Sequence, residues 1–341
     1  MGSLKDIASE LGVSYTLVSK VLRGKLGTTR VSERARKAIL AKAKEQDYKA
    51  NPAAVALKGG RKGAVGIFLH RLGTPGSEIS ERLVQGLAKG LDASGLRMWL
   101  RYFTTNEEFC AACDGKLQRE VDGLIVGGCH HPRLISNLRG IEAKGLPVVS
   151  VFFDSPGSNR NQLLEYRVSV DSERQGYLAT GHLLAQGCRR LVQFQSMKSR
   201  AKGFERAHRD AGISAIRELL LPITDDFSIE TGERLVRKLL DERVRFDGIV
   251  CHSDAQAVGA INELVRHGVD VPGKVKVTGV DNSPLADSCI VPVTSVTAGV
   301  RQTGLKAVEI LLKRIAGESA GPVMIEPRLV IRRSSAAASS E

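Results

Sequence analysis

From Gly63 onward, short apolar segments alternate with amphipathic segments of helical period, and this alternation restricts the possible folds most strongly. A first series predicts strands at residues 64–69, 98–103, 124–126 and 148–152, with helices between them that include residues 78–94. Repeated strand–helix units form parallel sheets that helices cover on both faces.

A second series of the same kind follows. Its strands are predicted at residues 168–170, 191–194, 249–250 and 275–280, and its helices at 172–185, 228–240, 255–267 and 300–315. Two series within residues 63–333 predict an α/β domain of two parallel-sheet subdomains. The chain is expected to cross between the two subdomains, and a cleft is expected to separate them. The Ser/Ala-rich tail, residues 334–341, is expected to be disordered.

The first 62 residues differ in pattern and in charge. They hold 14 lysines and arginines against 5 acidic residues, a net charge of +9, whereas the whole chain carries +13. A compact basic segment is typical of a protein that binds a polyanion, and nucleic acid is the first candidate. The alternative is a solvated basic face without a partner.

Residues 1–50 read as a small all-α head. Helices are predicted at 4–10, 15–22 and 32–46, and Gly12 suits a left-handed turn between the first two. Ser14 can cap the second helix. Helix, glycine turn and helix form the helix-turn-helix pattern, with a generic helical bundle as the alternative. The outward face of the second helix is predicted to carry Tyr15, Thr16, Ser19 and Lys20.

Residues 51–62 read as a short helix followed by a linker. Asn51 is a suitable N-cap, and glycines end the helix at 59–60. A helix of about seven residues is too short to be stable alone, so it should form only when a second copy packs on it. The alternative is a plain linker.

The segments 4–8, 11–22, 31–33 and 51–57 together closely resemble the DNA-binding head and hinge of the lactose/galactose repressor family. The resemblance implies that Tyr15, Thr16 and Lys20 read bases in the major groove and that Leu57 enters the minor groove as an apolar wedge. The loop 24–30 is longer than usual in that family, and position 55 is valine. The full set of candidate DNA-binding residues is Ser14, Tyr15, Thr16, Ser19, Lys20, Asn51 and Leu57.

Residues 63–333 resemble the effector domain of that family, which is similar to periplasmic sugar-binding proteins. The matching segments are 121–125, 147–149, 170–183, 187–190, 200–204, 253–259 and 279–282. The resemblance implies a small carbohydrate-like effector that forms hydrogen bonds with Arg200 and Asp281. Phe227 would stack on this effector, and Ser253 and Asp254 would line the pocket wall. On the other wall, Arg71, His130 and Asp154 supply polar character, which also suits an unusual or acidic effector.

The six cysteines are scattered, which suits a reducing compartment. Cys110 and Cys113 have metal or redox spacing within an expected helix at 107–119, but buried structural thiols are the simpler interpretation. Cys129-His130-His131 follows a strand and is interpreted as a polar pocket wall rather than a metal site. No cofactor, metal site, catalytic set, export signal or membrane span is expected, so the predicted location is cytoplasmic.

The sequence therefore predicts a DNA-binding transcriptional regulator, a repressor rather than an enzyme. Its expected partners are double-stranded operator DNA, a carbohydrate-like effector and a second copy of itself in a homodimer. A sugar-binding transport protein is the second hypothesis, and the basic head opposes it. An enzyme on an α/β scaffold is the third, because a fold does not fix a function.

Overall fold

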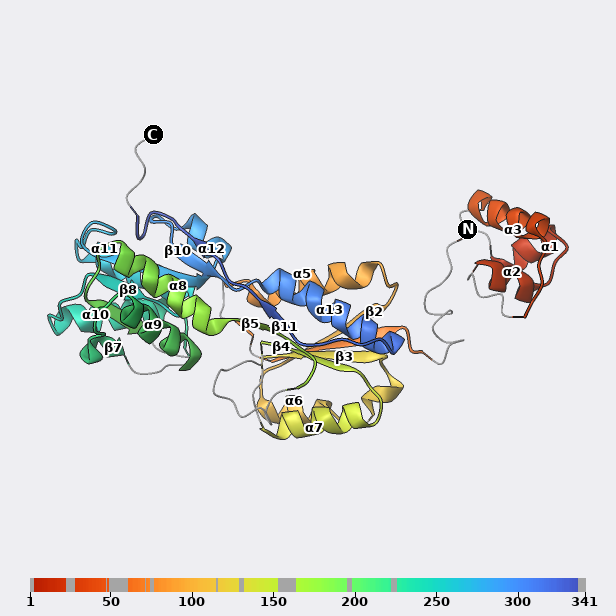
Figure 1. The fold of residues 1–341 in the computed structure, drawn as a ribbon, viewed down its shortest axis with the longest axis horizontal. Helices are drawn as coiled ribbons and strands as arrows, with labels where there is room; N and C mark the ends of the chain where they lie inside the picture. The colour runs from red at the N-terminus through yellow and green to blue at the C-terminus, as the bar shows by residue number, and fades with distance from the viewer. Residues whose placement is uncertain are drawn as a thin grey trace. The chain divides into compact units, whose positions relative to one another are not determined.

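The chain forms two compact units, Met1–Gly60 and Arg61–Glu341, in a computed structural model (Figure 1). The structure describes residues 3–22, 28–46, 48, 61–70, 72–73, 77–114, 116–128, 132–152, 164–194, 198–221 and 226–336. Most of the expected hinge, residues 51–60, therefore lies outside the described residues.

The first unit contains three short helices around one small core. They are α1 (Leu4–Glu10), α2 (Tyr15–Leu22) and α3 (Glu33–Glu45), as the sequence predicted. Ser3 and Asp6 form a capping box at the start of α1, and Gly12 adopts a φ of +61° in the turn before α2. The buried apolar side chains are those of Ile7, Ala8, Val18, Val21, Ile39 and Ala43.

The second unit contains two six-stranded sheets. The first has the strand order β11-β5-β4-β3-β1-β2 and the second has the order β12-β10-β9-β8-β6-β7. The first sheet comprises β1 (Ala64–His70), β2 (Arg97–Phe103), β3 (Gly123–Gly127), β4 (Val148–Val151), β5 (Arg167–Val170) and β11 (Val323–Ile325). The second comprises β6 (Leu191–Phe194), β7 (Leu220–Leu221), β8 (Gly248–Val250), β9 (Lys276–Asp281), β10 (Thr294–Thr297) and β12 (Leu329–Val330). All the ladders are parallel except that between β10 and β12.

Helices cover both faces of each sheet (Figure 1). On the first sheet, α5 (Ile79–Asp92) and α13 (Val300–Ala316) cover one face, and α6 (Asn106–Ala112) and α7 (Pro132–Ala143) cover the other. On the second sheet, α8 (Ser172–Ala185) and α9 (Lys198–Asp210) lie opposite α10 (Ile229–Asp241) and α11 (Asp254–Arg266). The short helix α12 (Pro284–Ser288) follows β9, and single 3₁₀ turns occur at Leu117–Arg119 and Arg217–Leu219.

Two elements assigned to the second series belong to the first sheet. Strand β5 pairs with β4 rather than with the second sheet, and α13 packs on α5 and β3 after the chain has crossed back. The apolar pattern of a segment specifies burial but not which sheet buries it. The helix expected at 107–119 is also wrong in extent, because α6 ends at Ala112, with Cys113 as its C-cap, and a 3₁₀ turn follows later.

The tail was expected to be disordered from residue 334, and this is wrong for its first residues. Ser334 and Ser335 are fully buried. The Ser334 amide donates to the Pro292 carbonyl at 2.9 Å, and its hydroxyl donates to the Val277 carbonyl at 2.6 Å. Small side chains with satisfied polar groups can enter a core, so composition alone misjudged this segment.

Three helix pairs cross through reciprocal glycines, which bring their backbones into direct contact. At the α8–α9 crossing, a Cβ on Gly176 would lie 2.2 Å from the Arg200 carbonyl oxygen, and one on Gly203 would lie 2.0 Å from that of Glu173. The α10–α11 crossing uses Gly232 and Gly259 in the same way, and the α5–α13 crossing uses Gly86 and Gly304. Only glycine permits these approaches.

We predict that Gly176→Ala lowers the free energy of unfolding by about 1–3 kcal/mol, because α9 must move away from the added methyl group. Gly181→Ala, in the same helix, is the matched control. A Cβ there meets nothing within 4 Å, so the higher helix propensity of alanine should leave stability unchanged or raise it by up to about 1 kcal/mol. Urea unfolding followed by circular dichroism measures both, and equal stability of the two variants would refute the crossing argument.

Candidate DNA-binding and effector-binding sites

The first turn of α2 presents polar side chains to solvent. The Ser14 hydroxyl accepts a hydrogen bond from the Leu17 amide at 3.1 Å and so caps the helix, as predicted. Tyr15 is 39% exposed, and Thr16 is exposed beside it. A phenol and a hydroxyl on a capped first turn are able to form hydrogen bonds with base edges in a major groove.

Two predicted positions on α2 differ from expectation. Ser19 is only 7% exposed, because α2 packs against both α1 and α3 and two of its sides are covered. Lys20 is half-buried, and its ammonium group donates to the Thr29 hydroxyl at 2.6 Å, a partner that sequence analysis missed. The candidate residues Asn51 and Leu57 lie outside the described residues.

Arg200 occupies the first turn of α9 rather than a loop at a strand end, and its guanidinium group is enclosed. Its Nε donates to Gln175 Oε1 at 3.2 Å, and its Nη1 donates to the His252 carbonyl at 2.5 Å. Nη1 also lies 2.9 Å from His252 Nδ1. Burial and the Arg200 charge hold the pKa of His252 well below its usual value, so a neutral imidazole accepts this bond.

Asp281 ends β9 and is 7% exposed, with a φ of +114°. Burial raises the pKa of its carboxyl group to about 8, and the nearby Asp254 charge acts in the same direction. The charges of Arg200 and Arg82 oppose that shift. No hydrogen-bond donor from the described part of the chain reaches the Asp281 carboxyl group, so the group is largely protonated near neutral pH.

The Asp254 carboxylate forms structural hydrogen bonds close to Asp281. Its Oδ2 accepts bonds from the Ser283 amide at 2.7 Å and hydroxyl at 3.0 Å, and its Oδ1 accepts one from the Ser295 hydroxyl at 2.5 Å. Burial raises the pKa of Asp254 to about 6 although these bonds favour the charged form. The carboxylate therefore fastens α11 to the segments after β9 and in β10.

Ser253 and Phe227 complete the cluster of C-terminal candidates. The Ser253 hydroxyl caps α11 by accepting from the Gln256 amide at 3.1 Å, and it donates to the Phe227 carbonyl at 2.8 Å. The Phe227 ring lies 4.2 Å from the His252 ring, centroid to centroid. The structure thus brings Arg200 and Phe227 together through His252, which sequence analysis missed although it lies only two residues after β8.

Arg82 is a further residue that sequence analysis missed. It projects from α5 of the first sheet, and its Nη1 donates to the carbonyl oxygens of Asp281 at 3.4 Å and Asn282 at 3.0 Å. These bonds connect the two subdomains directly. The candidates Arg71, His130 and Asp154 lie outside the described residues.

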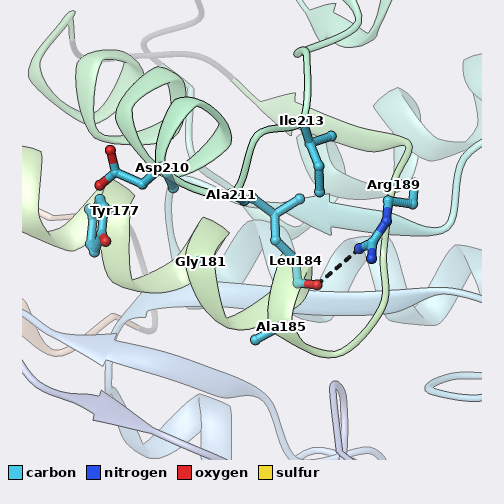
Figure 2. A pocket seen from close by; sticks show the side chains of 9 residues that line it. Tyr177, Gly181, Leu184, Ala185, Arg189, Asp210, Ala211 and Ile213 are labelled. Atoms are coloured by element: carbon cyan, nitrogen blue, oxygen red, sulfur yellow. Dashed lines mark hydrogen bonds between the residues drawn. The ribbon is translucent and has the colours of Figure 1, made fainter.

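A separate hollow of about 350 Å³ lies between α8 and α9 (Figure 2). Tyr177 and Asp210 line one end of it, and Arg189 lines the other, where its guanidinium group donates to the Leu184 carbonyl at 3.1 Å. None of the candidate effector-binding residues lines this hollow.

The described ranges contain neither a cluster of metal ligands nor a helix able to span a membrane. No three histidine, cysteine or carboxylate side chains of the described residues converge as metal ligands. Cys110 and Cys113 are buried, as expected, and Cys129 lies outside those residues. No helix in the same ranges combines the length and apolarity that crossing a bilayer requires.

A helix-turn-helix head in the same chain as a two-sheet α/β unit defines a ligand-responsive DNA-binding regulator. Residues 3–51 match the family described as bacterial regulatory proteins, lacI family, and residues 180–335 match a periplasmic binding protein-like domain. The regulator GntR of Pseudomonas aeruginosa is 30% identical over 324 residues, which cover 93% of this chain and 90% of that one. The chain belongs to the lacI family of transcriptional regulators.

Other comparisons agree with this assignment. The regulator DegA of Bacillus subtilis is 27% identical over 352 residues, with 97% of each chain covered. A lac repressor dimer bound to operator shares the fold with a TM-score of 0.75 and 21% identity, over 98% of this chain and 99% of that one. A complex of CelR with cellobiose has a TM-score of 0.69 and 24% identity, over 98% and 100% of the two chains.

We predict that Asp281 makes the protein less stable as the pH rises from about 4 to about 8. Its pKa is higher in the folded state than in the unfolded chain, so folding binds a proton and the stabilisation is lost as the pH passes the folded value. Histidines 182, 208 and 252 act in the opposite direction, because partial or full burial lowers their pKa values.

Comparison with Asp281→Asn isolates the carboxyl group from those histidines. The free energy of unfolding of the wild type minus that of the variant, measured in urea across this pH range, should fall as the pH rises. A constant difference would show that Asp281 ionises normally.

Proposed function

We propose that the protein is a homodimeric transcriptional repressor that binds operator DNA through α2 and responds to a carbohydrate-like effector bound in the second unit. The exposed first turn of α2, capped by Ser14 and carrying Tyr15 and Thr16, is the observation that carries this proposal. A packed three-helix core holds that turn rigidly, as base recognition requires. We assign the protein regulation rather than catalysis.

The charge of the head supports DNA binding. A net charge of +9 in the first 62 residues would displace counterions from phosphates, which makes binding strongly salt-dependent. Lys20 retains ammonium donors beyond the one given to Thr29, so it is able to reach a base edge while Thr29 orients it.

The polar cluster at the ends of β8 and β9 supports effector binding. Ligands of open α/β sheets bind beyond the carboxyl ends of the strands, where Arg200, Asp281 and Phe227 are found. A guanidinium group, a carboxyl group and an aromatic ring together suit a polyhydroxylated ligand. Among the solved relatives in fold, the CelR complex contains cellobiose.

Two exposed apolar surfaces support a homodimer. On the edge strand β2, Met98, Leu100 and Tyr102 share one face and are 36–52% exposed. On the second subdomain, Val265 is 50% and Ile290 is 87% exposed beside a shallow groove. Uncovered apolar surfaces of this kind mark association sites, and one head reads only half of a symmetric operator.

We expect Tyr15→Ala and Lys20→Ala each to weaken binding to operator by about 1–3 kcal/mol and to relax base preference. The operator is first obtained by selecting bound duplexes from a random DNA library with the full-length protein. Lys44→Ala, at an exposed lysine of α3, is the charge-matched control and should leave the selected sequence unchanged. Failure to select any sequence, or equal losses on operator and random DNA for both α2 variants, would count against the proposal.

For the dimer, we expect Leu100→Glu combined with Ile290→Glu to yield monomers, because two charges would be buried unpaired at the interface. Ile331→Glu, at another exposed isoleucine, should leave the dimer intact. Sedimentation velocity distinguishes the species, and a wild-type monomer at micromolar concentration would contradict this part of the proposal.

A further inference from the structure

Two arginines from different subdomains meet the carboxyl ends of adjacent parallel strands. Arg200 donates to the carbonyl of His252, just after β8, and Arg82 donates to the carbonyl of Asp281, at the end of β9. Because β8 and β9 are neighbours in the sheet, the two guanidinium groups lie at the same edge.

Neither guanidinium group forms an ion pair with a carboxylate of the described residues. No carboxylate oxygen in those ranges lies within 4.0 Å of Arg82 or Arg200, and the hydrogen-bond partners of both are neutral carbonyl, amide and imidazole groups. Both groups are only partly exposed to water and have no counter-ion in contact, so such a site favours an anion from outside.

The surrounding groups leave an excess of positive charge. Asp254 is negative, but it is fixed by Ser283 and Ser295. Arg332, from the segment after β12, pairs with Asp287 at 3.1 Å. Asp281 is largely protonated near neutral pH, so it offers a donor rather than a second negative charge.

We propose, on the basis of the function proposed above, that the effector carries a carboxylate or phosphate group that binds between Arg82 and Arg200. A guanidinium group has five N–H donors, and the bonds that Arg82 gives to two carbonyls come from Nη1, so donors remain for the anion. The anion would then connect the two subdomains, since Arg82 comes from α5 and Arg200 from α9. Arg82 is thus both a binding residue and the sensor of subdomain closure.

Calorimetric titration of the full-length protein near neutral pH tests the proposal. The probes are neutral hexoses and disaccharides, each paired with its sugar acid and its sugar phosphate, and inorganic phosphate as the charge alone. We expect an anionic member to bind at least about tenfold more tightly than its neutral parent, the effect of one charge-assisted hydrogen bond.

Three α5 variants assign the effect to Arg82. Arg82→Met should weaken binding of the anionic probe at least about tenfold more than it weakens binding of the neutral parent, and Arg82→Lys should restore part of that difference. Lys89→Met removes an exposed charge from the same helix and should change neither affinity.

The pH dependence gives a second measurement. Above about pH 8, Asp281 loses its proton, so the anion should bind up to about tenfold more weakly per pH unit, and Asp281→Asn should remove this decline. A neutral sugar that binds as tightly as its acid, or an anion whose affinity survives Arg82→Met, would overturn the proposal. Absence of binding by every anionic probe, inorganic phosphate included, would also overturn it. Selection of a specific operator by the same protein would show that the regulatory function stands even so.

Discussion

The backbone contact between α8 and α9 is the constraint on which the candidate effector site depends. Gly176 and Gly203 allow the two helices to approach until each touches the carbonyl of the other, and the carbonyl that Gly176 meets belongs to Arg200. The first turn of α9 is therefore fixed against α8, where Gln175 also holds the Arg200 guanidinium group. The position of the Arg200 charge therefore depends on Gly176 having no side chain.

The same principle continues around the site. The α10–α11 crossing places a glycine against the Gln256 carbonyl, and Gln256 binds both the His252 amide and the Asp226 carbonyl. A Cβ on Gly279 would lie 2.4 Å from Asp254 Oδ1. Close-packed backbones thus pre-organise Arg200, His252 and Asp254, whereas Arg82 reaches the site from the other subdomain.

Local patterns predicted much of the molecule. The head could be predicted because Gly12, the Ser14 cap and helical periodicity act within a few residues of one another. The burial of Ser19 could not be predicted in this way, because it depends on a third helix packing on α2. The sequence also did not specify the sheet to which β5 and α13 belong, because a buried segment has the same composition on either sheet. The role of Arg82 could not be predicted from the sequence, because its partners are backbone carbonyls about two hundred residues away in the chain.

Ligand binding and DNA binding are proposed to be coupled in one chain, and coupling between two binding sites is reciprocal. The most direct test is calorimetric titration of the tightest-binding probe into the full-length protein, alone and saturated with its selected operator. This coupling predicts affinities that differ by about 5–150-fold, which corresponds to about 1–3 kcal/mol of coupling free energy. Equal affinities in the two titrations, for a ligand whose binding requires Arg200, would contradict it.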